Sequence, residues 1–233
     1  MSLLNFRGMQ KTSLIDYPPY IVATLFVGGC NFRCGFCHNP DLVNVAKDMP
    51  VISEDEIFSF LKKRSNVLDG VCISGGEPLL YHDLTGFVKK LKEAGWVVKI
   101  DTNGTNPELL AELIDNNLVD YVAMDIKAPP LKYSKIAGVD VDISKIQKSI
   151  DILKKGKVGY EFRTTVVPKL FNERDAKDIG RWLVGAKKYA IHQFRGGRTL
   201  DESFSKEKSY THEDLEKFKR IVSEYIENVE VRA

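Results

Sequence analysis

Short apolar runs alternate with longer amphipathic segments from about residue 20 to the end of the chain. The run YIVATLFV at 20–27 is apolar and rich in β-branched residues, which is typical of a strand buried on both faces. In the segment SEDEIFSFLKKR, Ser53 and Glu56 have the spacing of a capping box and an apolar stripe follows, so a helix is predicted. The same pattern predicts strands at 20–27, 70–74, 96–100, 118–126, 158–167 and 188–194. It predicts helices at 53–64, 83–95, 107–117, 143–156, 173–185 and 213–229.

Six alternating strand–helix units predict an α/β fold whose parallel strands are joined by right-handed crossovers. Two architectures fit this pattern: an open doubly wound sheet, and a barrel that stops short of the full eight units. The chain has 233 residues and contains neither a low-complexity tract nor a Gly/Ser linker. Residues 1–233 are therefore expected to form a single domain.

Polar motifs follow five of the six predicted strands. CNFRCGFCHN, GGEP and DTNG come after the first three strands, DIK closes the fourth and HQFRGG closes the sixth. In a parallel sheet or barrel the carboxyl ends of the strands lie on one face, and ligands bind there. We therefore expect these motifs to converge on one site, although they are far apart in the sequence.

Composition and charge remove several classes of function. The net charge is only +2, which gives no reason to expect nucleic acid or anionic lipid as a partner. No apolar run approaches the roughly 20 residues that span a bilayer, and the N-terminus lacks the apolar core of a signal peptide. We therefore expect a cytoplasmic protein that does not associate with membranes. In that reducing compartment, clustered thiols bind metal or do redox chemistry more often than they form structural disulfides.

Three of the four cysteines fall within the stretch GGCNFRCGFCHNP, with the spacing C-x3-C-x2-C. A structural zinc site would need a fourth ligand, and His38, directly after Cys37, is poorly placed to reach the same ion. Cys72 is better explained as a small buried residue of the second strand. A disulfide would leave an odd thiol. An iron–sulfur cluster with four irons normally takes four thiolates, so three would leave one iron open to another ligand.

A C-x3-C-x-aromatic-C motif after the first strand of a β/α repeat resembles the signature of the radical S-adenosyl-L-methionine (SAM) enzymes. The resemblance implies a partial (β/α)6 TIM-like barrel with parallel strands, open on one side. It implies that Cys30, Cys34 and Cys37 bind three irons of one 4Fe-4S cluster, and that SAM chelates the fourth iron. Phe36 and His38 match positions that contact the adenosyl part of SAM, although a packed aromatic ring and a solvent-facing histidine are the alternatives.

The segment SGGEP at 74–78 resembles the Gly-Gly-Glu motif of the same family. Gly75 and Gly76 would let the backbone approach the ligand closely. Glu77 would accept hydrogen bonds from the SAM ammonium group. On its own such a motif is only a turn that ends a strand, and its position after the second strand is what gives it weight.

DTNG at 101–104 and MDIK at 124–127 resemble segments of the glycyl-radical-enzyme activases, a subgroup of the family. The matching residues Asp101, Thr102, Asp125 and Lys127 are expected near the SAM carboxylate. Carboxylates this close repel one another, so a monovalent cation between them, or the Lys127 ammonium, would be needed for balance. The alternatives are a helix-capping turn for DTNG and a solvated ion pair for Asp125 and Lys127.

Two further residues are carried over from the activases. Arg163, in FRTTVVP, matches an arginine of their fifth strand, and His192 lies where they place a residue near the SAM ribose. The register of the sixth strand is uncertain, so Gln193 or Phe194 could take that place instead. RGGR at 195–198 could contact a protein partner or a nucleotide, or be a solvated loop.

The resemblance covers about residues 8–194 and is most specific in QKTSLIDYPPYIVATLFVGGCNFRCGFCHNPDL, which looks like the activating proteins of anaerobic ribonucleoside-triphosphate reductase. It implies an oxidoreductase that cleaves SAM reductively to a 5′-deoxyadenosyl radical and generates a glycyl radical on that reductase. A low-potential donor such as flavodoxin or ferredoxin would supply the electron. The alternatives are activation of another glycyl-radical enzyme of the pyruvate formate-lyase type, chemistry on a small molecule, and a zinc-stabilised interaction module.

Overall fold

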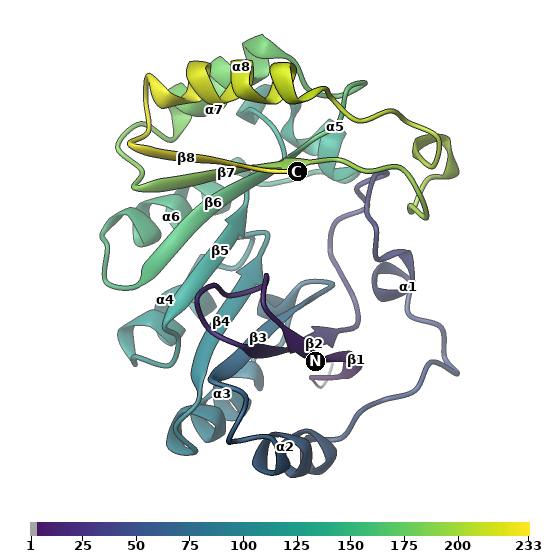
Figure 1. Ribbon diagram of the computed structural model, residues 1–233, viewed down its shortest axis with the longest axis vertical. Helices are drawn as coiled ribbons and strands as arrows, with labels where there is room; N and C mark the ends of the chain where they lie inside the picture. Colours follow the sequence, from purple (N-terminus) through teal and green to yellow (C-terminus); the bar gives the residue numbers. More distant parts are fainter. Residues whose placement is uncertain (1–3) are drawn as a thin grey trace.

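One eight-stranded sheet runs through the protein in the order β1 to β8, as the computed structural model of residues 4–233 shows (Figure 1). Strands β2 to β8 are parallel, and each pairs with the next along the sequence, whereas β1 pairs antiparallel with β2. The strands are β1 (Phe6–Ser13), β2 (Val22–Val27), β3 (Gly70–Gly75), β4 (Val97–Thr102), β5 (Tyr121–Asp125), β6 (Gly159–Val166), β7 (Lys188–Gln193) and β8 (Asn228–Arg232).

Most helices cover the outer side of the curved sheet, whereas the short helix at Pro40–Val43 lies on its open side, and the sheet does not close into a full barrel (Figure 1). Within the described residues, β1 and β8 form its two edges. The helices are α1 (Pro40–Val43), α2 (Glu54–Lys63), α3 (Leu84–Glu93), α4 (Pro107–Asp115), α5 (Tyr133–Ala137), α6 (Ile143–Lys154), α7 (Glu173–Trp182) and α8 (His212–Ser223). The predicted class, a partial barrel of parallel strands that is open on one side, is confirmed.

Alternation along the strands separates an apolar outer face from a polar inner one. In β4, Val98 and Ile100 belong to the main hydrophobic core, while Lys99 and Asp101 point to the inner side and form an ion pair. Helices bury the outer face, and on the inner face the side chains of Lys99 and Asp101 are only 4% and 14% exposed. Charged side chains such as Lys99 and Asp101 can therefore lie inside the barrel, where they pair with each other.

All six predicted strands and their intervening helices are present, and the capping box of Ser53 and Glu56 at the start of α2 is confirmed. Two strands were missed. The residues of β1, FRGMQKTS, carry too few apolar side chains to signal a strand. At the other end of the chain, the prediction of a helix that continues to residue 229 was wrong. That helix, α8, ends at Ser223, and Val229 and Val231 instead extend the sheet as part of β8.

The described residues, 4–233, include no helix with both the length and the apolar character required to cross a membrane.

Candidate functional site

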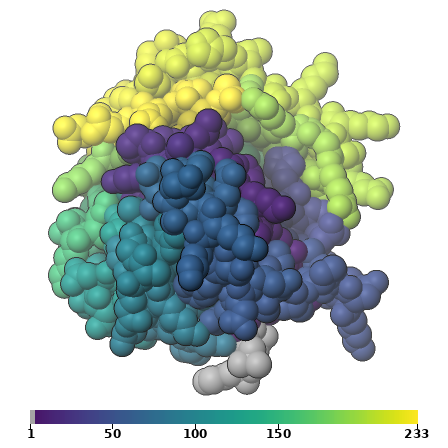
Figure 2. Space-filling model, turned by 60° about the horizontal axis from the view of Figure 1, so that its bottom comes forward, coloured from purple at the N-terminus to yellow at the C-terminus, as the bar shows by residue number. Residues whose placement is uncertain are grey.

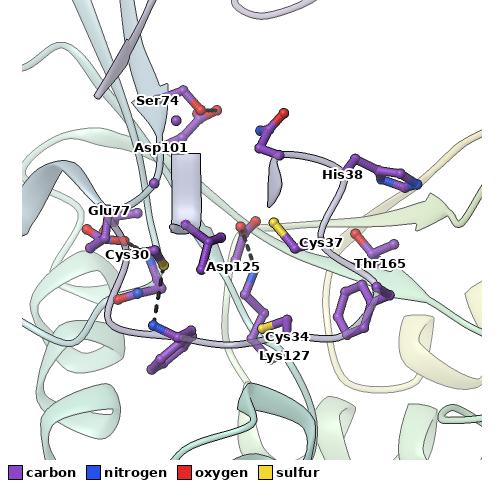
Figure 3. Close-up of a pocket in the computed structure, with 18 of the residues that line it drawn as sticks. Cys30, Cys34, Cys37, His38, Ser74, Glu77, Asp101, Asp125, Lys127 and Thr165 are labelled. Carbon is purple, nitrogen blue, oxygen red and sulfur yellow. Dashed lines mark hydrogen bonds and ion pairs between the residues drawn. The ribbon is translucent and has the colours of Figure 1, made fainter. Parts of the chain in front are cut away.

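A cavity of about 250 Å³ lies at the carboxyl ends of the strands (Figure 3). Every candidate site residue from the sequence lines it except His192. The structure therefore brings together side chains from the loops after β2 and β3 and from the ends of β4, β5 and β6. Sequence reasoning missed six of its lining residues: Phe32, Asn39, Val43, Ser74, Asn103 and Thr165. Ser74 and Asn103 lie inside the quoted motifs, and Thr165 follows Arg163 at the spacing that returns to the same face of β6.

The cysteine loop, residues 28–39, is held in place by backbone hydrogen bonds. The Arg33 amide donates to the carbonyl of Ala137 at 2.7 Å, and the Cys37 amide donates to the carbonyl of Cys34 at 3.0 Å. The Arg33 guanidinium donates to the carbonyl of Cys30 at 2.6 Å. These contacts shape the loop so that its three thiols face one space (Figure 3).

The three cysteines are free thiols, and Cys34 is buried. Burial raises the pKa of the Cys30 thiol to about 12 and also raises that of Cys34. Such thiols bind a metal as thiolates, and their protons are released when the metal binds. Within residues 4–233, no group of three or more His, Cys, Asp or Glu side chains is close enough together to hold a single metal ion. A multi-iron cluster does not need that arrangement, because each thiolate binds a different iron, so the donor set fits a 4Fe-4S cluster.

Cys72 lies apart from these thiols. It is fully buried in a separate small group with Tyr17 and Val22, as expected for a small core residue. The ring of His38 points away from the Cys37 thiol (Figure 3). Neither residue therefore lies in position to complete a zinc site with the cysteine loop.

The segment 194–205 covers the outer side of the cysteine loop. The amides of Leu200 and Asp201 donate to the carbonyls of Cys37 and Gly35 at 3.0 and 2.9 Å. The His38 ring stacks on Phe194 with 5.2 Å between centroids, and its Nε2 is 2.7 Å from the carbonyl oxygen of Arg195. The RGGR sequence is thus part of a cover over the cysteine loop.

The SGGEP segment contacts the cysteine loop and the end of β2 directly. The Glu77 amide donates to the carbonyl of Gly29 at 2.8 Å, and the Gly76 amide donates to that of Val27 at 2.9 Å. A Cβ atom on Gly76 would overlap the carbonyl of Gly29, and Gly75 has φ of 115°, a conformation that favours glycine. The two motifs therefore depend on each other for their backbone positions.

Glu77 is buried, with 1% of its surface exposed. Its carboxylate accepts hydrogen bonds from the Thr102 hydroxyl and the Asn103 amide, both at 2.6 Å, and from the Leu79 amide at 3.0 Å. Burial raises the pKa of Glu77 to about 7, although these three donors act against the shift. Glu77 therefore links the loops after β3 and β4 on the wall of the cavity.

Asp101 and Asp125 are bridged by Arg163. The guanidinium lies 3.3 Å from Asp101 and 2.9 Å from Asp125. Lys99 pairs with Asp101 at 2.8 Å, and Lys127 pairs with Asp125 at 2.9 Å. Burial alone would raise the pKa of both carboxyl groups, but these cations hold both pKa values below the ordinary range.

Three side-chain cations thus balance the charge of the two carboxylates. Lys127, the alternative to a bound cation in the sequence analysis, does contact Asp125. The residues present do not require an added monovalent cation, and such an ion stays a prediction.

His192 lies in a second cavity, of about 760 Å³, on the inner side of the sheet. This cavity is lined by the loop between β1 and β2 and by residues of β4 to β8, and Arg163 lines both cavities. The His192 Nε2 is 3.4 Å from the Arg232 guanidinium. Gln193 shares the second cavity, and its amide donates to the carbonyl of Tyr210. A contact of His192 with SAM stays a prediction.

We expect His192 to make the protein less stable as the pH falls below 6.5. Burial, together with the Arg163 and Arg232 charges, lowers the pKa of His192 to about 4. Between pH 6.5 and 4 the unfolded chain therefore binds a proton that the folded protein does not. The free energy of unfolding therefore decreases as the pH is lowered through this range. His192→Gln should lose less stability than the wild type between pH 7 and 5 in urea unfolding. His212→Gln, at an exposed position, should follow the wild type, and equal slopes for all three would contradict the assignment.

The family model described as "Radical SAM superfamily" matches residues 24–183. A protein of Methanocaldococcus jannaschii named "Putative glycyl-radical enzyme activating enzyme" is 39% identical over 230 residues, which cover 97% of this chain and 94% of that protein. The pyruvate formate-lyase-activating enzyme of Clostridium pasteurianum is 33% identical over 133 residues, or 54% of each chain.

Among solved structures, SuiB of Streptococcus suis bound to S-adenosylmethionine superposes with a TM-score of 0.68 at 16% identity. The match covers 88% of this chain but only 48% of SuiB, so the chain spans about half the length of that protein. At this level of identity the likeness concerns the fold alone.

Proposed function

The chain belongs to the radical SAM superfamily, and from this premise we propose that it activates a glycyl-radical enzyme, with an anaerobic ribonucleoside-triphosphate reductase as partner. The observation that carries the activase proposal is the 39% identity, over almost the whole chain, to a relative named for that activity. The choice of the reductase rests on the N-terminal sequence around the cysteine loop. We also propose that residues 1–233 act as one domain in the cytoplasm.

The family implies a 4Fe-4S cluster and SAM as cofactors. When bound, the reduced cluster supplies the electron that cleaves the S–C5′ bond of SAM. Cys30, Cys34 and Cys37 would bind the cluster. The cover formed by 194–205 would limit the access of water and oxygen to the cysteine loop.

The remaining cavity residues would bind and orient SAM. Glu77 offers a carboxylate to an ammonium group, and Arg163 and Lys127 offer positive charge to a carboxylate. Asp101 and Asp125 keep these two cations in place through ion pairs. The residues proposed for SAM are Phe36, His38, Gly75, Gly76, Glu77, Asp101, Thr102, Asp125, Lys127, Arg163 and His192.

The open side of the barrel supports a macromolecular substrate. The second cavity lies between the loop that joins β1 to β2 and the last two strands, and it meets the first cavity at Arg163. On the face shown in Figure 2, N-terminal residues (purple) lie directly beside C-terminal residues (yellow). It contains both acidic and basic side chains, including Glu161, Lys188 and Arg232. An extended segment that carries the target glycine could pair its amides and carbonyls with such a surface. A low-potential flavodoxin or ferredoxin stays our prediction for the electron donor.

Anaerobic reconstitution with iron and sulfide, followed by reduction with dithionite, tests this proposal. The release of 5′-deoxyadenosine from SAM would be measured with and without an anaerobic ribonucleotide reductase, and EPR would monitor a glycyl doublet. A doublet that needs both proteins supports the full proposal. SAM cleavage without a doublet would exclude that reductase as partner and favour another glycyl-radical enzyme or a small molecule. A zinc-loaded protein that leaves SAM intact would overturn the proposal.

We expect the exposed apolar pair Leu14 and Ile15 to contact the partner. Their side chains are 67% and 79% exposed, Ile15 lines the second cavity, and adjacent exposed apolar residues often mark a contact surface. The double change Leu14→Ser and Ile15→Ser should raise, by about tenfold, the reductase concentration for half-maximal glycyl radical. The SAM affinity of the activase alone should not change. Val184→Ser, at another exposed apolar position, is the control, and equal behaviour of the two variants would contradict this contact.

A further inference from the structure

Lys99 is a lysine in the middle of a buried strand, and the ion pair with Asp101 described above is not its only contact. Its side chain is 4% exposed. It points to the inner side of β4, where its register neighbours are Cys72 on β3 and Tyr121 on β5. A buried ammonium group is strongly unfavourable unless it is paired. Lys99 lines the second cavity and not the first, so direct contact with SAM in the first cavity does not explain it.

The Lys99 ammonium has two partners from distant parts of the chain. It forms an ion pair with Asp101 at 2.8 Å and donates to the backbone carbonyl of Asp16 at 2.5 Å. Asp101 lies on the wall of the first cavity, where its other oxygen accepts from the Ser74 hydroxyl at 3.1 Å. Asp16 belongs to residues 14–21, which we call the hairpin loop because they join β1 to β2. One buried ammonium therefore connects this loop to the cavity.

The hairpin loop has one side inside the sheet and one side in solvent. Tyr17 is 7% exposed and packs on Tyr121 with 5.4 Å between ring centroids. The Asp16 carboxylate accepts from the Thr24 hydroxyl at 2.5 Å. Leu14 and Ile15, at the start of the loop, are exposed. In Figure 1 the loop, in dark purple, folds over the inner side of the sheet beside β3 and β4.

We propose that Lys99 is a positioning residue that couples the hairpin loop to Asp101, so that holding the loop in place strengthens SAM binding. The proposal rests on the proposed function only through the role of Asp101 in binding SAM. Binding free energies are reciprocal, so SAM must strengthen the docking of the partner by the same factor by which the docked partner strengthens SAM binding. This link would let the activase bind SAM most tightly when its partner is present.

The test compares wild type, Lys99→Met and Lys99→Arg by amide hydrogen exchange of the hairpin loop. Methionine has a similar length without the charge, and arginine keeps the charge. Without cluster or SAM, Lys99→Met should speed exchange in the loop, because the bond to the Asp16 carbonyl is lost. In cluster-loaded wild type, SAM should slow that exchange, and Lys99→Met should lose this response and bind SAM about tenfold more weakly. Lys99→Arg should keep part of both effects.

Lys157→Met is the matched control, because Lys157 forms an ion pair with Asp115 at an exposed site and should change neither quantity. If Lys99→Met exchanges like wild type without ligands, the link to the loop is wrong. If it binds SAM and responds to SAM like wild type, the coupling is wrong although the proposed function stands. If the wild type itself does not bind SAM, the proposed function fails, and the coupling falls with it. If Lys99→Met does not fold, Lys99→Arg is compared with the wild type instead. If Lys99→Arg then binds SAM and responds to SAM like the wild type, the proposed role of the Lys99 contacts is wrong.

Discussion

Cys34→Ala is expected to prevent normal assembly of the 4Fe-4S cluster and to abolish SAM cleavage, while the chain still folds. Cys34 is the most buried of the three loop cysteines, at 6% exposure, and removing it leaves two thiolates for four irons. The fold should survive, because the loop keeps its backbone hydrogen bonds to Ala137 and within itself. Iron and sulfide content, the visible absorbance and the release of 5′-deoxyadenosine measure the effect, and circular dichroism measures the fold.

Cys72→Ala is the matched control, since it also removes a buried thiol but at a position away from the cavity. It should retain four irons and full turnover, with at most a modest loss of stability. A Cys34→Ala protein with a complete cluster and normal turnover would show that the loop thiols are not the cluster ligands. Loss of the cluster in Cys72→Ala would show that the ligand set has been assigned wrongly.

Gly76→Ala is expected to destabilise the protein by about 2 kcal/mol or more and to abolish measurable SAM binding. The new methyl group would overlap the carbonyl of Gly29, which belongs to the cysteine loop and cannot move alone. The hydrogen bond from the Glu77 amide to that carbonyl would be displaced as well. Urea unfolding and SAM titration of the cluster-loaded protein measure the two effects.

Gly86→Ala provides the comparison, because a Cβ atom there meets nothing within 4 Å and Gly86 lies inside α3. An alanine inside a helix is about 0.5–1 kcal/mol more favourable than glycine, so this variant should be more stable than wild type and bind SAM normally. A Gly76→Ala protein that matches the wild type in both stability and SAM affinity would mean that the two loops do not depend on each other.

The sequence predicted those helices and strands whose pattern of apolar and polar residues is complete within one short segment. The strand from Val22 to Val27 is apolar except for Thr24, and the capping box at Ser53 marks a helix start, so neither signal depends on the rest of the chain. The residues of β8 could not be assigned in this way. Val229 and Val231 alternate over too short a stretch, and they become a strand because β7 offers them a paired edge.

The site could be predicted as far as strand order determines it. Since parallel strands end on one face, Cys30, Glu77, Asp101 and Asp125 were expected to converge, and they line one cavity. The register of the sixth strand was not predictable to one residue. Because alternation and strand tilt decide which cavity a side chain enters, His192 lies in the second one.

The sequence by itself determined the alternation of strands and helices, the cysteine spacing and the resemblance that identifies the family, since each is written within short stretches of residues. Only the tertiary structure decided which buried charges meet. Lys99 contacts Asp16 across 83 positions of sequence, and Arg163 joins Asp101 to Asp125. No local pattern encodes such contacts, because they depend on how strands are paired and on which way each side chain faces inside the barrel.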